Sequence, residues 1–90
     1  MGLVDFHYAI NDRHLSISLD EDGGIDRHDL YRDVFSVISI LEAVEAISVE
    51  EAEITLLSSS ETIQCDMRGI KSAIGMSFQE IVSSYCQTVP

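Results

Sequence analysis

The acidic loop Asp20–Asp26 contains the oxygen-bearing residues from which a cation site could be built. It holds four carboxylates and two adjacent glycines. An EF-hand loop that began at Asp20 would need glycine at its sixth position and glutamate at its twelfth, but the sequence has Ile25 and Tyr31 there. The pattern therefore indicates a glycine turn followed by a helix cap, with weak cation binding as the alternative.

Histidines are the other candidate metal ligands. His7 and His14 fall on one face of a predicted hairpin, with Asp5 and Asp66 as further oxygen ligands. The predicted register places His7 opposite Ser18 and far from His14, whereas a zinc site usually needs three or four convergent ligands. We therefore expect surface histidines, no metal or other cofactor, and folding that does not require an ion.

The residues that could support catalysis form no familiar pattern. There is no nucleophile elbow, HExxH, CxxC, phosphate loop or dinucleotide fingerprint. Asp20 and Asp22 form a carboxylate pair on a predicted loop, without a sign of the cleft that general acid–base chemistry requires. Cys65 and Cys86 are far apart in the sequence, so we expect free thiols in a reducing cytosol. The sequence predicts a protein that is not an enzyme.

Charge is the one feature of the composition outside the ordinary range. Five Lys and Arg stand against sixteen Asp and Glu, which gives a formal net charge of −11. This charge opposes direct binding to nucleic acid or anionic membranes and favours a partner with a basic surface, with solubility alone as the alternative explanation. No apolar run approaches the length of a membrane span, and the N-terminus lacks the pattern of a signal peptide, so we expect a soluble cytoplasmic protein.

Alternating apolar residues predict two hairpins. In the first, a tight turn at residues 12–13 gives the pairs Ile10 with Leu15, Tyr8 with Ile17 and Phe6 with Leu19. In the second, a turn at residues 60–61 pairs Leu56 with Cys65 and Ile54 with Met67. We expect burial of Phe6, Tyr8, Ile17, Leu19, Ile54, Leu56 and Cys65. The opposite face is expected to carry the polar set His7, His14, Ser16, Ser18, Thr55, Leu57, Gln64 and Asp66.

A helix is predicted after each hairpin. The first begins at the N-cap Asp26, with Asp29 in its first turn. Its core stripe is Leu30, Val34, Val37, Leu41 and Val44. The second runs from about Gly69 or Lys71 to Gln87. It is expected to bury Ile70, Ile74, Phe78, Ile81 and Tyr85.

The ninety residues therefore predict one α+β domain, residues 1–90, with the order ββα-ββα. The two units cover about residues 3–47 and 52–89. The expected architecture is a four-stranded, mainly antiparallel sheet with two helices on one face.

The first helix carries more apolar surface than one sheet contact requires. A second row, Tyr31, Phe35 and Ile38, packs either against the second helix or against a partner. Carboxylates then gather at the end of the helix and in the linker, where the helix dipole disfavours them, and no Lys or Arg occurs between Arg32 and Arg68. The predicted partner-binding set is Tyr31, Phe35, Glu42, Glu45, Glu50, Glu51 and Glu53. A solvated acidic rim is the alternative.

These features favour a small acidic binding protein that docks on, and thereby inhibits, a protein or nucleoprotein with a basic surface. In size and charge alone the chain is similar to toxin-immunity proteins, anti-CRISPR proteins and nucleic-acid mimics. One alternative is a structural or regulatory homodimer, formed through the first helix or an open sheet edge. A second alternative is a small enzyme or ligand carrier with a site that the sequence does not reveal.

Overall fold

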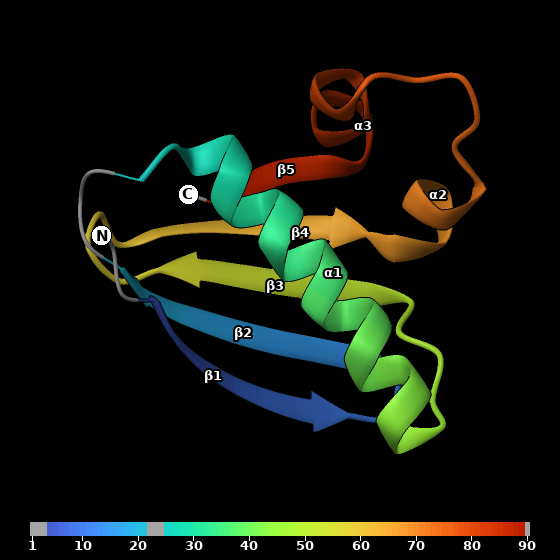
Figure 1. Ribbon diagram of the computed structural model, residues 1–90, viewed down its shortest axis with the longest axis horizontal. Coiled ribbons are helices and arrows are strands. Elements are labelled where there is room, and N and C mark those ends of the chain that lie inside the picture. Colours follow the sequence, from blue (N-terminus) through green and yellow to red (C-terminus); the bar gives the residue numbers. More distant parts are fainter. Residues whose placement is uncertain (1–3, 22–24, 90) are drawn as a thin grey trace.

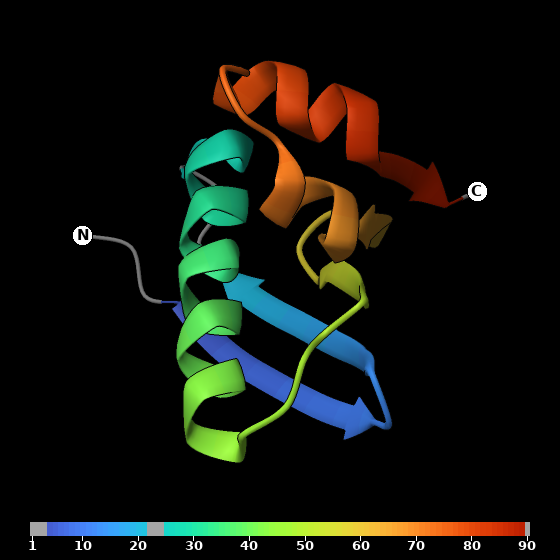
Figure 2. The same cartoon turned by 90° about the vertical axis from the view of Figure 1, so that its right-hand side faces the viewer.

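Five strands and three helices form two layers in the part of the chain that the computed structural model describes, residues 4–21 and 25–89. The sheet contains the strands in chain order, β1-β2-β3-β4-β5, and the helices cover one of its faces (Figure 1, Figure 2). The elements are β1 (Val4–Asn11), β2 (His14–Glu21), α1 (Arg27–Glu45), β3 (Glu51–Leu56), β4 (Glu61–Asp66), α2 (Met67–Ser72), α3 (Phe78–Tyr85) and β5 (Cys86–Val89). No helix among these residues has the length and apolar character needed to cross a membrane.

The β1–β2 hairpin has the register that the sequence predicts. Asp12 adopts a left-handed conformation in the turn, with φ of 60°. The cross-strand pairs include Ile10 with Leu15, Tyr8 with Ile17 and Phe6 with Leu19. The three partners on β2 are fully buried, but Phe6 and Tyr8 are 37% and 50% exposed, which corrects the prediction of their burial. The reason is that β1 is an edge strand, whereas α1 crosses the middle of the sheet (Figure 1).

The sheet is mixed and five-stranded, where a mainly antiparallel sheet of four strands was predicted: β3 pairs with β2 in parallel orientation, whereas the other three pairings are antiparallel. Parallel neighbours need a crossover connection of a dozen or more residues, and α1 provides it. The end of this crossover is fixed to the β1–β2 turn, because the backbone N–H of Glu50 donates to the carbonyl oxygen of Arg13 at 2.9 Å. The two predicted hairpins thus become one mixed sheet.

The β3–β4 hairpin has a different register from the predicted one. A four-residue turn, residues 57–60, joins the strands, and Ser60 is left-handed with φ of 57°. The observed pairs include Leu56 with Glu61, Ile54 with Ile63 and Ala52 with Cys65. Leu56 is therefore not opposite Cys65, and Met67 is the first residue of α2. The partner of each residue moves by an even number of positions, so Ile54, Leu56 and Cys65 are still buried, as predicted.

Two short helices and a fifth strand replace the single helix that was predicted to reach Gln87. Gly75, with φ of 74°, lies between α2 and α3, and Ser77 begins α3 with a capping box that includes Glu80. Ile74, expected to be buried, is 92% exposed in this connection. Apolar residues continue at helical spacing through the break, which is why the pattern suggested one helix. The end of the described chain pairs with β4 as β5.

α1 begins as predicted but presents a rotated face to the sheet. Asp26 is its N-cap and accepts a hydrogen bond from the backbone N–H of His28 at 2.8 Å. The buried residues are Leu30, Tyr31, Val34 and Ile38. Val44, assigned to the core stripe, is 73% exposed. The buried side of α1 therefore contains residues of both the predicted core stripe and the second row, and Val37 and Leu41 are half-buried.

α3 packs against the side of α1 that carries Arg32 and Phe35. The ring centroids of Phe35 and Phe78 are 5.7 Å apart, and the guanidinium carbon of Arg32 lies 4.7 Å from the centroid of the Phe78 ring. Cation–π contacts of this kind add to the apolar attraction. The second apolar row of α1 therefore packs within the chain.

The core position Ile17 and its neighbour Ser18 test the assignment of the two sheet faces. Ile17 is almost fully buried, so Ile17→Ala should lower the free energy of unfolding by about 2–5 kcal/mol. Ser18 lies on the face without helices, so Ser18→Ala should change it by less than about 0.5 kcal/mol. Urea unfolding monitored by circular dichroism measures both, and equal effects would show that the faces are assigned wrongly.

Candidate functional site

The aromatic members of the predicted partner-binding set lie inside the fold. Tyr31 is buried between α1 and the sheet, and this burial raises the pKa of its phenol above the ordinary value. Phe35 is half-buried against Phe78 of α3. Neither ring is therefore displayed as an anchor for a partner.

Glu42 serves a structural role that the sequence did not reveal. Its Oε2 accepts hydrogen bonds from the backbone N–H of Val49, at 2.8 Å, and from Nζ of Lys71 in α2. Lys71 also donates to the carbonyl oxygen of Val49 at 2.9 Å. Three segments thus meet at one carboxylate whose side chain is 17% exposed. The positive charge that the sequence near Glu42 lacks is therefore supplied by Lys71 of α2.

Glu50 is held in a similar way by a cation from an earlier segment. Nη1 of Arg13, in the β1–β2 turn, lies 3.0 Å from Oε1 of Glu50. Because the side chain of Arg13 is largely exposed, the ion pair adds little stability by itself. It does neutralise one of the predicted binding carboxylates.

The remaining carboxylates of the predicted set are divided between two places. Glu45 is exposed at the end of α1. Glu51 and Glu53 alternate with the buried Ala52 on β3, so they point away from the helices. Oε2 of Glu51 lies 3.5 Å from Nδ1 of His14. The structure therefore brings Glu51 and Glu53 together, but it separates them from Glu45.

Glu51 and Glu53 belong to the sheet face that the helices leave uncovered, which we name the open sheet face. Cross-strand register assigns to it His7, Ala9, Asn11, His14, Ser16, Ser18, Asp20, Glu51, Glu53, Thr55, Thr62, Gln64, Asp66, Gln87 and Val89. The polar set predicted for this face from the two hairpins is found there, except Leu57, which lies in the β3–β4 turn. None of the five strands contains Lys or Arg. The open sheet face is therefore acidic.

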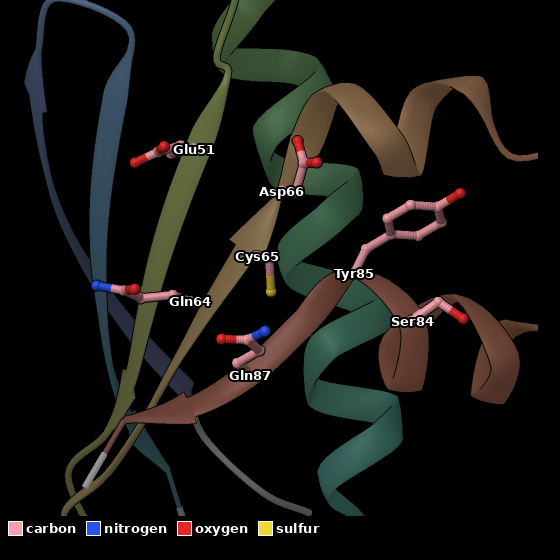
Figure 3. A pocket seen from close by; sticks show the side chains of 7 residues that line it. All are labelled: Glu51, Gln64, Cys65, Asp66, Ser84, Tyr85 and Gln87. Carbon is pink, nitrogen blue, oxygen red and sulfur yellow. The ribbon is translucent and has the colours of Figure 1, made fainter.

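A polar pocket of about 300 Å³ lies where the open sheet face meets β5 and the end of α3. Its lining comes from β3, β4, β5 and the end of α3, as Figure 3 shows: Glu51, Gln64, Cys65, Asp66, Ser84, Tyr85 and Gln87. Asp66 is fixed as the N-cap of α2, since its Oδ1 accepts from the backbone N–H groups of Arg68 and Gly69 at 3.1 and 3.2 Å. Two carboxylates and two side-chain amides offer acceptors suited to an ammonium or guanidinium group.

The Tyr85 wall of the pocket depends on a glycine. A Cβ placed on Gly69 would lie 2.4 Å from Cδ1 of Tyr85, a distance that side chains cannot adopt without movement. The absence of a side chain at Gly69 therefore lets the Tyr85 ring rest on α2. No sequence pattern signalled this contact, because the sequence placed both residues in one helix.

The candidate metal ligands do not converge among the described residues, where no group of three or more His, Cys, Asp and Glu could hold an ion. Part of the calcium-like loop, residues 22–24, lies outside the described residues, as does the side chain of Asp5. Within the loop, Asp26 acts as a helix cap. His14 lies beside Glu51, and His7 pairs with Ser18 as predicted.

Cys65 and Cys86 are brought together although they are far apart in the sequence. They are directly opposite each other in the β4–β5 pairing. Both thiols are free, as predicted. β5 was not predicted, so the sequence reading could not place them side by side.

Comparison with models of protein families, with curated proteins and with solved structures gave no significant match. The open sheet face and its pocket are therefore interpreted from their own chemistry.

Glu42 and Glu45 form a matched pair for a charge-reversal test. Glu42→Lys removes the acceptor of the buried Val49 N–H and faces Lys71 with a like charge, so it should lower the free energy of unfolding by about 1–3 kcal/mol. The helix dipole alone would predict the opposite sign, because a cation is favoured at the C-terminal end of a helix. Glu45→Lys should stay within about 0.5 kcal/mol of the parent. Equal urea midpoints for the two variants would contradict the structural role of Glu42.

Proposed function

We propose that the chain is a small, acidic, non-catalytic protein that binds a protein or nucleoprotein with a basic surface through the open sheet face. The observation that supports this most directly is the pocket, which places Glu51 and Asp66 on a face whose strands lack Lys and Arg. While this chain covers the basic surface of the partner, the partner cannot bind phosphate-bearing ligands at that surface. Binding would therefore inhibit such a partner.

The distribution of cations supports the proposal. Four of the five Lys and Arg form ion pairs on the helix side of the sheet or in turns: Arg13 with Glu50, Arg27 with Glu61, Arg32 with Asp29, and Lys71 with Glu42. No ion pair with Lys or Arg reaches Glu51, Glu53 or Asp66 in the described part of the chain. The field of the open sheet face is therefore not cancelled locally.

The pocket suggests how contact would be made specific. Carboxylates on the face attract a cationic partner over a distance of about one Debye length, roughly 8–10 Å in physiological salt. An arginine or lysine side chain of the partner then enters the pocket. Glu51 and Asp66 offer charged acceptors there, and Gln64 and Gln87 offer amide oxygens. Electrostatic steering acts mainly on the association rate, and the filled pocket acts mainly on dissociation.

A fluorescent arginine-rich peptide tests this function, with a glutamate-rich peptide of equal length as the control probe. Fluorescence anisotropy should show binding of the basic peptide only, weakening as salt is raised. Glu51→Lys should reduce its affinity at least tenfold, a change of about 1.4 kcal/mol. Glu45→Lys makes the same charge change away from the pocket, so it should have a clearly smaller effect.

Equal losses for the two variants would show that only net charge matters and would contradict the pocket. Binding of both peptides with the same affinity would contradict the proposal altogether.

Self-association is the second candidate function, and the edge strand β1 favours it. In the described part of the chain β1 has no strand on its outer side, and its sequence contains no Lys or Pro and one carboxylate, Asp5, to protect that edge. Phe6 and Tyr8 are partly exposed on its helix side. Helical spacing places the exposed Ile40 and Val44 on the side of α1 that faces away from Phe78, toward β1. Two copies could pair through β1 and bury these side chains.

Sedimentation velocity over a range of protein concentrations measures this association. If β1 is a dimer interface, the parent chain should sediment as a concentration-dependent dimer that higher salt favours, because salt screens like charges. Tyr8→Lys should give a monomer, whereas Glu51→Lys should leave the dimer intact. A parent chain that is monomeric at every concentration and salt would exclude the second function.

A further inference from the structure

The thiols of Cys65 and Cys86 form a contacting pair across two neighbouring strands. Because they are direct cross-strand partners, their side chains lie on the same face of the sheet. That face is the one covered by the helices, where Cys65 is buried and Cys86 is half-buried. The side chain of each cysteine shifts the pKa of the other thiol through a hydrogen-bond interaction.

The backbone geometry at this pair is compatible with a covalent link. Directly opposite residues in an antiparallel pair have Cα atoms about 4.5–5.5 Å apart, and disulfides span Cα distances of about 4.4–6.8 Å. Among the described residues, β5 is a four-residue edge strand that pairs with β4 alone. A small approach of β5 toward β4 is therefore enough for bond formation.

The two thiols have different reactivity. The hydrogen bond from Cys65 lowers the pKa of the Cys86 thiol below its ordinary value, against the effect of burial. The hydrogen bond to Cys86, together with burial, raises the pKa of the Cys65 thiol. Since the thiolate is the nucleophile, the partly exposed Cys86 should react with an oxidant before Cys65 does.

We propose that Cys65 and Cys86 are a redox-modification site, which a small-molecule disulfide such as oxidised glutathione converts to an intrachain disulfide between β4 and β5. Cys86 Sγ attacks one sulfur of the oxidant, whose S–S bond breaks and releases one thiolate. That thiolate takes the proton of Cys65. Cys65 Sγ then attacks Cys86 Sγ, and the second half of the oxidant leaves as a thiolate, which takes up the proton that Cys86 lost to solvent when it became the attacking thiolate. Two cysteine thiols are oxidised, and one disulfide is reduced to two thiols.

The link would enclose the segment 66–85, which contains α2 and α3. Closing this loop restricts the unfolded chain and should stabilise the oxidised protein. The thermal midpoint should rise by roughly 10 °C for a chain of this size. Cys65 also lines the pocket of the proposed binding function, but the two thiols lie opposite each other whether or not a partner binds there, so the redox site does not rest on that function.

The test incubates the reduced protein with mixtures of reduced and oxidised glutathione, followed by acid quenching, alkylation and mass spectrometry. The oxidised parent should be monomeric, should lack two hydrogens, and should resist alkylation at both cysteines. Cys65→Ser should instead accumulate one glutathione on Cys86, because the resolving thiol is missing. Cys86→Ser should react much more slowly, since Cys65 is buried.

Circular dichroism and thermal melting under reducing conditions establish that each variant is folded, and Cys65→Ala replaces the serine variant if the buried hydroxyl prevents folding. The proposal is overturned if excess oxidised glutathione leaves the folded parent with two free thiols. It is also overturned by glutathione adducts or intermolecular dimers without the internal link. Equal rates for the two serine variants would overturn the assigned order of attack.

Discussion

The parallel pairing of β2 with β3 is the interaction on which the rest of the architecture depends. It places the buried side of the first hairpin beside the buried side of the second, with Ile17 next to Ile54 at the centre of the sheet. Both are almost fully buried, and neither hairpin alone has enough apolar surface to be stable in water. The pairing also requires a long crossover, which becomes α1 and carries Val34 and Ile38 onto the same core. The pairing of β2 with β3 therefore determines both the arrangement of the sheet and the presence of α1 above it.

Local patterns predicted the elements that depend on neighbours in the sequence. The alternation around Asp12 and the cap at Asp26 each involve a few adjacent residues, and both were placed correctly. The parallel pairing and β5 depend on contacts across the chain, which alternation cannot distinguish. The break at Gly75 was missed because one glycine among apolar residues at helical spacing is a weak local signal. Burial of Tyr8 was overestimated because an edge position follows from strand order, not from pattern.

The charged residues of the candidate site were likewise predictable only where they depend on neighbours in the sequence. The sequence identified an excess of carboxylates around Glu42 and Glu51, and it placed Glu51 near the end of the first helix. It could not show that Lys71 and Arg13 come from distant segments to neutralise part of that group. It also did not place Glu51 on the same sheet face as Asp66, because the second unit was predicted to begin at about residue 52, after Glu51. The composition was enough to predict an acidic surface. Where the acidic residues lie on the molecule depends on the tertiary structure.

The strands lie in the sheet in the same order in which they occur in the sequence, and this order affects the rate of folding. Each hairpin can form from residues that are close in sequence, whereas the crossover through α1 and the segment 66–85 before β5 must each close a long loop before their contacts form. Loop closure of this kind is an entropic barrier that grows slowly with length, and sheets rich in non-local pairs fold slowly. Here the non-local steps are two, the pairing of β2 with β3 at Ile17 and Ile54 and the addition of β5 to β4. The transition state for folding is therefore expected to resemble the docking of two preformed hairpins.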